Sequence, residues 1–288
     1  MVGEQPRVSV ILPVYRAEQY IRRCIEGLLN QDCEFDFEII MVNNNSPDQS
    51  ANIIGEYSDI KLLSETKQGA YAARNMGIRA AVGDILVFTD PDCVHKCDWL
   101  SLVEATMRDP AIGILVGSSL SFSPLPGLRH LDAYERQKES FILSSEDPIL
   151  YWGRTSNMAV RAEIMRQFGP FHELLRGADV IFVRTVVNMT SCDGVRYAPE
   201  IAVEHLELNS VGTYLRKVFI YGRSRVYYNQ KIRARPLSMR ERLHVYRQTI
   251  RTEQYSCFDA AVLCALLILG LCCWYAGAAT AWKKEVQS

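Results

Sequence analysis

The chain has 288 residues, 48% of them hydrophobic, which is enough for one large α/β domain or two small ones with a substantial core. Its 32 basic and 33 acidic residues nearly balance, which excludes a general electrostatic attraction to nucleic acid. Nine cysteines in an irregular arrangement argue against a disulfide framework and favour a reducing compartment.

Apolar runs and amphipathic stretches alternate in the first part of the chain. Nearly continuous apolar runs predict buried strands at residues 8–14, 37–42, 60–63 and 85–88. Apolar residues at helical spacing predict helices at residues 18–29, 49–57 and 70–81. This alternation implies right-handed βαβ units, and therefore an α/β fold with a mostly parallel central sheet and flanking helices.

The pattern is looser after residue 110. Strands are expected at residues 112–122 and 195–203, with a strand or turn at residues 151–159. Helices are expected at residues 128–143, 162–168, 179–190 and 210–229. We expect this part to complete one domain and to supply the site for a second ligand.

Two carboxylates, Asp90 and Asp92, follow the strand expected at residues 85–88. In extended backbone, residues i and i+2 point to one side, so both acids converge at the carboxyl end of the strand, where open α/β sheets bind ligands. Paired oxygens there suit Mg²⁺ or Mn²⁺ beside a substrate diphosphate. The alternative is a polar turn with solvated acids, which the Asp-x-Asp pattern taken alone favours.

Several common signatures are missing from the sequence. Where a dinucleotide-binding fingerprint would place Gly-x-Gly-x-x-Gly after the first strand, residues 13–16 read Pro-Val-Tyr-Arg, which removes most support for a nicotinamide or flavin dehydrogenase. No Walker phosphate-binding loop is present either. Cys93 and Cys97 flank His95, but no second close Cys/His pair completes a zinc site.

The C-terminal part contains a stretch suited to a bilayer. Residues 260–282 carry no charge and, as a helix, span roughly 34 Å, which is sufficient to cross a bilayer core. Aromatic residues near its end and two lysines beyond it fit an interfacial belt. A buried core helix is the alternative. We expect a single-pass transmembrane helix at residues 258–282.

The segment before this stretch is basic and amphipathic. Leu243, Tyr246 and Ile250 recur at helical spacing with arginines between them, which predicts a helix on the membrane surface within residues 233–257. A solvated helix packed on the main domain is the alternative. Because these arginines outnumber the lysines after the span, we expect the large domain on the cytoplasmic side.

Several ordered motifs between residues 8 and 225 resemble the family 2 glycosyltransferases, in a membrane-anchored bacterial-type form. The motifs are Val-Ser-Val-Ile-Leu-Pro-Val-Tyr at 8–15, Glu-Ile-Ile-Met-Val-Asn-Asn-Asn-Ser at 38–46, Gly-Ala-Tyr-Ala-Ala-Arg-Asn-Met-Gly at 69–77, Gly-Asp-Ile-Leu-Val-Phe-Thr-Asp-Pro-Asp at 83–92 and Gly-Ala-Asp-Val-Ile-Phe-Val-Arg at 177–184. The resemblance implies the Rossmann-like type-A glycosyltransferase fold. It also implies a catalytic domain at 1–232, with a nucleotide-sugar-binding half at 1–110 and an acceptor-binding half at 111–232.

The resemblance places the nucleotide-sugar donor on the amino-terminal half. Pro13 and Tyr15 would border the base and ribose. Asn44 stands where the family has an acid that contacts the nucleoside, so the base is less certain, with uridine as the default. Arg74 and Asn75 would lie near the base and phosphates; the alternative for Arg74 is a surface salt bridge.

The resemblance also assigns the metal site and the catalytic base. Asp90 would contact ribose or metal, Asp92 would bind the Mg²⁺ or Mn²⁺ directly, and His205 would approach the metal or diphosphate unless it is a core histidine. Asp179 matches the general base that deprotonates the acceptor hydroxyl, although helix N-capping is an alternative or additional role. The family often has Glu before this Asp, where this chain has Ala178.

Arg154 and Asn157 match the acceptor side. Together these features predict an inverting, metal-dependent transfer of a sugar to a hydroxyl of a membrane-associated acceptor, such as a lipid-linked glycan, a glycolipid or a growing surface polysaccharide. A processive synthase is disfavoured because its usual Gln-x-x-Arg-Trp sequence is missing. A catalytically weak nucleotide-sugar-binding membrane protein is the main alternative. A nucleotidyltransferase would normally show a Gly-rich basic loop after the first strand.

Overall fold

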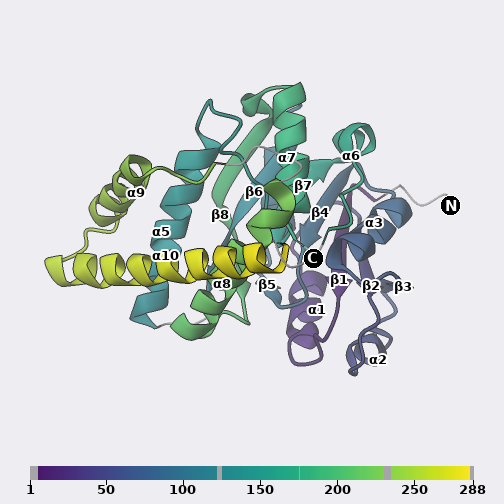
Figure 1. Cartoon of the computed structure of the whole chain (residues 1–288). Helices are drawn as coiled ribbons and strands as arrows, with labels where there is room; N and C mark the ends of the chain where they lie inside the picture. Colours follow the sequence, from purple (N-terminus) through teal and green to yellow (C-terminus); the bar gives the residue numbers. More distant parts are fainter. Residues whose placement is uncertain (1–5, 122–124, 175, 230–234, 286–288) are drawn as a thin grey trace. The chain divides into compact units, whose positions relative to one another are not determined.

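The structure, a computed structural model, describes residues 6–121, 125–174, 176–229 and 235–285. Its strands are β1 (Val8–Val14), β2 (Phe37–Asn43), β3 (Ile60–Ser64), β4 (Ile85–Thr89), β5 (Cys93–His95), β6 (Ile114–Ser121), β7 (Asn157–Arg161) and β8 (Val195–His205). They form one eight-stranded sheet in the order β3-β2-β1-β4-β7-β6-β8-β5 (Figure 1).

Helices connect and flank these strands. They are α1 (Ile21–Leu29), α2 (Ser50–Ile54), α3 (Ala70–Ala80), α4 (Trp99–Met107), α5 (Pro126–Leu143), α6 (Ala162–Phe168), α7 (Ala178–Met189), α8 (Val211–Asn229), α9 (Met239–Thr252) and α10 (Cys257–Glu285), with a short 3₁₀ turn, η1 (Cys192–Gly194). The expected fold class, an α/β protein with a mostly parallel central sheet, flanking helices and a C-terminal apolar helix, is confirmed.

The first half of the sheet follows directly from the apolar runs. Strands β3, β2, β1 and β4 are parallel neighbours, and every side chain of β1 and β4 is buried, as strands covered on both faces require. In register, Val14 lies opposite Asn43, which lies opposite Ser64. The carboxyl ends of these strands therefore share one edge. Strand β7 runs antiparallel to β4, with Asn157 opposite Thr89, and so begins at that edge.

The chain divides into two compact units. Residues 1–119 and 152–205 form one, here called the sheet unit, and residues 120–151 and 206–288 form the other, here called the helical unit. The boundary expected at residue 110 separates a donor-binding from an acceptor-binding half of one domain, and it stays a prediction. Helix α5 groups with the C-terminal helices because its contacts are with α9 and α10.

A close approach fixes α3 on the sheet unit. A Cβ atom on Gly77 would lie 2.5 Å from Cγ2 of Ile11 on β1, so only glycine allows the helix backbone to lie this near the sheet. Tyr71, Arg74 and Asn75, on the same helix, are all buried. Helix α3 therefore presents polar side chains to the sheet edge from a fixed position.

The helical unit contains the long apolar helix. Within α10, the stretch Cys257–Thr280 is long and apolar enough to cross a membrane, and an 18-residue window of it has a mean hydropathy of 2.3. A helix at the centre of a soluble core would be mostly buried, whereas only 11% of the most apolar 18-residue window of this stretch is buried. The side chains at residues 282–284, part of the expected interfacial belt, lie outside the described ones.

Candidate active site

Arg74 joins the carboxylate at the end of β4 to α3. Its Nη2 donates a hydrogen bond to Oδ1 of Asp90 at 2.5 Å. The Arg74 side chain is only 5% exposed and that of Asp90 27%, so this is a largely buried ion pair. The alternative of a surface salt bridge for Arg74 does not hold. Its Nε is buried without a hydrogen-bond partner among the described residues, which leaves a donor for a ligand.

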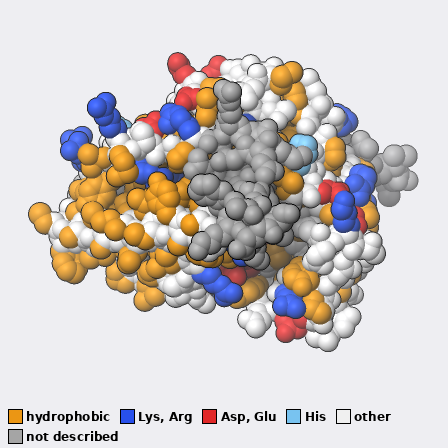
Figure 2. Space-filling view, in the orientation of Figure 1, with side chains coloured by type: hydrophobic (Ala, Val, Ile, Leu, Met, Phe, Trp, Pro, Cys, Tyr) orange, Lys and Arg blue, Asp and Glu red, His pale blue; other side chains and the backbone are white. Residues whose placement is uncertain are grey.

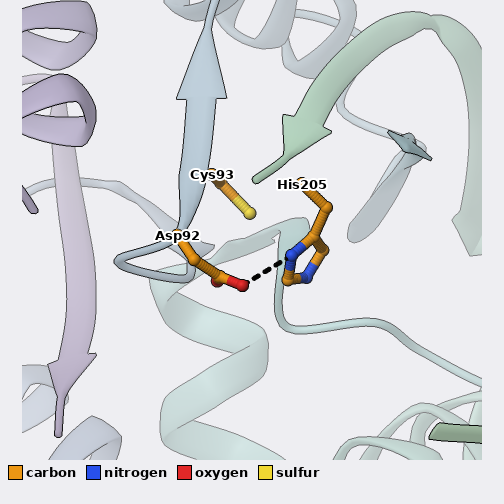
Figure 3. A group of neighbouring side chains, drawn as sticks. All are labelled: Asp92, Cys93 and His205. Carbon is orange, nitrogen blue, oxygen red and sulfur yellow. Dashed lines mark ion pairs between the residues drawn. The ribbon is translucent and has the colours of Figure 1, made fainter. Parts of the chain in front are cut away.

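Asp92 lies in a second polar cluster with Cys93 and His205 (Figure 3). Pairing of β5 with β8 places Cys93 opposite His205, and the potential ligand atoms of the three residues lie within 4.8 Å of one another. Nδ1 of His205 approaches Oδ2 of Asp92 to 2.7 Å, but without the alignment of a hydrogen bond. His205 was expected to approach the metal or diphosphate, and its place beside Asp92 supports this role, which stays a prediction.

This cluster fits a divalent cation. Two ligands of one octahedral ion, each about 2.1 Å from it, lie about 3 Å apart, close to the separation of the Asp92 and His205 atoms. A carboxylate with an imidazole suits Mn²⁺, and carboxylates suit Mg²⁺. Burial, followed by the charges of Asp92 and Asp90, raises the pKa of the Cys93 thiol well above its usual value, so the thiol stays neutral and is a weak ligand.

Asp179 reaches the same region from α7. Phe171 packs between Tyr71 on α3, at a ring distance of 5.6 Å, and Phe182 on α7, at 5.2 Å, which places the start of α7 beside α3. Gly177 is the N-cap of α7, so Asp179 lies inside the first turn rather than at the cap position. N-capping therefore does not explain its presence.

The carboxyl of Asp179 is held by several donors. The backbone nitrogen of Val180 donates to Oδ1 at 2.9 Å, and that of Thr155 lies 3.5 Å from Oδ2. Burial raises the pKa of Asp179, while a hydrogen bond from the Tyr71 side chain and the charge of Arg74 act in the opposite direction. A raised pKa suits a group that must accept a proton near neutral pH.

Tyr71 and Arg74 connect Asp179 with Asp90. The two α3 side chains are three residues apart, on one face of the helix, and the Arg74 guanidinium lies 5.4 Å from the centre of the Tyr71 ring. Burial raises the pKa of Tyr71 well above its usual value, so its hydroxyl stays protonated and donates to Asp179. Tyr71 was not predicted from the sequence, although its spacing from Arg74 offered a signal.

Asn44 holds a neighbouring loop in this structure. It was expected to contact the nucleoside, but it is only 2% exposed. Its Nδ2 donates to the carbonyls of Glu65 and Lys67 at 2.9 and 2.8 Å, and its Oδ1 accepts from the Gly69 nitrogen at 2.7 Å. All of its hydrogen-bonding groups are therefore used to hold residues 65–69, which lead into α3.

Asn75 and Asn157 hold backbone segments in a similar way. Asn75 is 2% exposed and makes two hydrogen bonds with the backbone of Phe171, at 2.8 and 3.0 Å. Asn157 is also 2% exposed; its Nδ2 donates to the carbonyls of Ser118 and Ile201 and its Oδ1 accepts from the Trp99 indole. These largely buried amides join backbone segments through their side-chain oxygen and nitrogen atoms.

The other expected ligand contacts differ in accessibility. Pro13 is buried inside β1 opposite Val42, which places it within the sheet rather than against a nucleoside. Tyr15, just past the carboxyl end of β1, is 45% exposed and lies under the Arg16 guanidinium at 5.4 Å. Arg154 is half-buried, with its guanidinium 5.2 Å from the centre of the Trp152 ring. Roles for Tyr15 and Arg154 in ligand binding stay predictions.

Residues 9–169 match the family model described as Glycosyl transferase family 2, which covers more than half of the chain. The chain belongs to glycosyl transferase family 2. A family relative, "Glycosyltransferase AglE" of Haloferax volcanii, is 30% identical over 200 residues, which are 65% of this chain and 64% of AglE. "Putative glycosyltransferase EpsH" of Bacillus subtilis is 42% identical over 101 residues, 34% of this chain and 28% of EpsH. The chain thus spans less than two thirds of these relatives.

Solved structures share the fold of this family member. Mannosyltransferase PcManGT from Pyrobaculum calidifontis, in complex with GDP-Man and Mn²⁺, has a TM-score of 0.64 at 18% identity, over 97% of this chain and 88% of its own. S. aureus TarS 1-349 in complex with UDP has a TM-score of 0.54 at 18% identity, over 87% and 72%. The expected type-A glycosyltransferase fold is confirmed.

Proposed function

We propose that this chain is a metal-dependent, inverting glycosyltransferase that moves a sugar from a nucleotide-sugar donor to a hydroxyl group. The main support is the convergence of Asp90 and Asp179, from β4 and α7, on the Tyr71–Arg74 pair of α3. Asp90 lies two residues from the candidate metal ligand Asp92, and Asp179 has a raised pKa. Donor activation and acceptor deprotonation need these two kinds of group in one place.

On the donor side, Asp92, Asp90 and His205 are the proposed contacts of Mg²⁺ or Mn²⁺ and the diphosphate. A bound divalent ion would stabilise the negative charge that develops on the leaving diphosphate. Arg74 orients Asp90 and keeps a buried Nε available for a polar group of the donor. The neighbours contain GDP-Man in one case and UDP in another, so uridine remains only the default base.

On the acceptor side, Asp179 is the proposed general base. The acceptor oxygen forms its bond to the anomeric carbon as the bond from that carbon to the diphosphate oxygen breaks, and the hydroxyl proton passes to the Asp179 carboxylate. Direct displacement of this kind inverts the anomeric configuration. Ala178 offers no carboxylate to support Asp179, and the hydrogen bonds from Thr155, Val180 and Tyr71 supply that support instead.

The acceptor is proposed to be membrane-associated, either a lipid-linked glycan or a glycolipid, with the catalytic residues on the cytoplasmic side. The apolar α10 supports attachment to a membrane, since a soluble acceptor would not require it. Nine cysteines, none in a disulfide within the described residues, fit a reducing compartment.

A nucleotide-sugar-binding protein without turnover is the competing function, and the departures at Asn44 and Ala178 favour it. To test this, the purified full chain is incubated with UDP- and GDP-linked sugars, Mn²⁺ or Mg²⁺ and a membrane lipid extract. We expect release of nucleoside diphosphate and a lipid that gains the mass of one sugar. Donor binding without any nucleotide release, with either metal, would favour the binding protein.

A further inference from the structure

Helix α10 has one packed face and one exposed face. Leu263, Gly270 and Gly277 lie two helical turns apart and are buried. On the other side, Phe258 is 77% exposed and Tyr275 is 60% exposed, near opposite ends of the apolar stretch. Ile268 and Leu269 between them are 57% and 51% exposed. One side of the helix thus contacts the protein near both ends of the apolar stretch, while the other side is apolar and uncovered.

The beginning of α10 is bound to α5 and α9 within the helical unit. Nε2 of His130, a buried side chain of α5, lies 3.2 Å from Oδ1 of Asp259 in the first turn of α10. The hydroxyl of Tyr246 on α9 donates to the carbonyl of Ala260 at 2.8 Å. The ring of Tyr255, just before α10, packs on His130 at 4.6 Å. This end therefore cannot leave the helical unit without breaking these partly buried polar contacts.

The far part of α10 is bound to α8. A Cβ atom on Gly222 of α8 would lie 2.0 Å from the carbonyl oxygen of Trp274, and one on Gly277 would lie 2.0 Å from that of Phe219. The two backbones touch, as they do in close helix pairs that have glycine at the crossing. Asp259 and Gly277 are 18 residues apart (277 − 259), or about 27 Å along the axis.

Both attachments of α10 belong to one folded unit. This argues against a helix that crosses the bilayer. A bilayer core is about 30 Å thick, so a crossing helix would place α5 near one surface and α8 near the other, or both within hydrocarbon. Arg129 on α5 and Arg216 and Arg223 on α8 are exposed. Charged side chains in contact with acyl chains are strongly disfavoured.

We infer that α10 lies in the plane of the membrane surface. Its exposed face, with Phe258, Ile268, Leu269 and Tyr275, is buried among the acyl chains, and its packed face stays on the helical unit. Figure 2 shows hydrophobic side chains following one another along α10 without a charged one among them, and Lys and Arg side chains at the margin of this area. The side of α10 turned away from the lipid is covered by α5 and α8 of the same unit rather than by water.

Helix α9 adds a basic surface to the same unit. Arg240, Arg247 and Arg251 are exposed, and none is paired with an acidic side chain within the described part of the chain. Met239 and Leu243, beside them, are 70% and 45% exposed. Arginines of this kind bind anionic headgroups while short apolar side chains enter the interface.

The apolar side of α9 differs from the expected one. Tyr246 and Ile250, expected to face lipid with Leu243, are partly buried, and Val245 and Thr249 between them are buried. This side packs on α5, so only the arginine-bearing side is available to a membrane.

The inference rests on the membrane attachment proposed above but not on the transfer reaction. It is tested on the full chain with a protease-cleavable epitope at each terminus, in sealed inverted membrane vesicles from an expressing bacterial host. A helix in the membrane plane leaves both epitopes on the same side of the membrane. We therefore expect the protease to cleave both. Cleavage of one epitope with protection of the other would overturn the inference in favour of a crossing. Nucleotide release, measured separately in detergent, reports on the proposed function.

A second measurement identifies what covers the exposed face. The double variant Ile268→Glu/Leu269→Glu is expected to reduce flotation with vesicles containing 30% anionic lipid at least tenfold. The matched control Met189→Glu changes a side chain of the sheet unit that is 72% exposed and is expected to float like the unmodified chain. Unchanged flotation of the double variant, or its conversion of a stable dimer to a monomer without lipid, would contradict a lipid-facing α10; circular dichroism confirms that each variant is folded.

Discussion

The hydroxyl oxygen of Tyr71 lies 3.5 Å from the backbone nitrogen of Asp179, although 108 residues separate the two in sequence. The same hydroxyl hydrogen-bonds the Asp179 carboxyl, and Arg74, one turn along α3, binds Asp90. One helix therefore positions both the proposed base and an acid of the proposed donor site. The distance between these two groups depends on α3 rather than on flexible loops.

The pH dependence of turnover should reflect the raised pKa of Asp179. A base works only when deprotonated, so activity is lost as the pH falls through this pKa, which burial holds above the ordinary value of about 4 for Asp. We expect the pKa that describes the acidic limb of the pH profile of kcat to lie clearly above that ordinary value. A limb at or below it would contradict the assignment of Asp179 as the base.

Tyr71→Phe should shift this limb further. The Tyr71 hydroxyl lowers the pKa of Asp179, so its removal raises that pKa and moves the acidic limb of kcat to higher pH. Tyr57→Phe removes a hydroxyl elsewhere in the sheet unit and serves as the control. If both variants keep the unmodified profile, the hydroxyl does not act on the base.

Turnover should depend on a divalent cation bound by Asp92 and His205. Treatment with a chelator should abolish it, and added Mn²⁺ or Mg²⁺ should restore it. His205→Ala removes one proposed ligand, so the Mn²⁺ concentration for half-maximal activity should rise about tenfold or more. His172→Ala, at an exposed histidine, is the matched control. Full activity of the chelated protein would argue against this site.

Asn44→Ala should destabilise the sheet unit. It removes the hydrogen bonds to the carbonyls of Glu65 and Lys67 and to the amide of Gly69, and each hydrogen bond contributes about 0.5–1.5 kcal/mol. We expect urea denaturation to give a free energy of unfolding lower by at least about 1 kcal/mol. Asn52→Ala, at an exposed amide, should stay within about 0.5 kcal/mol of the unmodified chain. An equal effect of both changes would show that the Asn44 contacts contribute little.

Much of the fold could be predicted because buried parallel strands carry a continuous apolar signal. Strands β1 and β4 lie where the runs at residues 8–14 and 85–88 indicated. The three-residue β5 and the helix α4 were not predicted. Strand β5 is too short for a periodic signal, and it forms through pairing with β8, which follows far along the chain.

The site was only partly predictable from the sequence. Period-two spacing placed Asp90 and Asp92 at the carboxyl end of β4, but the position of Asp179 came from the family resemblance, because it depends on tertiary packing through Phe171. Asn44, Asn75 and Asn157 show that residue type alone does not define a role. An asparagine side chain can bind a ligand or join backbone segments, and its burial in the fold helps to distinguish these roles.

The most direct test of the catalytic account compares Asp179→Asn with the unmodified chain, using Mn²⁺ and the nucleotide sugar that supports turnover in the incubation described under Proposed function. Asn keeps the size of the side chain but accepts no proton, so kcat should fall by about 10²–10⁴-fold while the dissociation constant of the nucleotide stays unchanged. Asp193→Asn, at an exposed acid in η1, should leave both values unchanged. Turnover of Asp179→Asn at the rate of the unmodified chain would contradict the proposed mechanism.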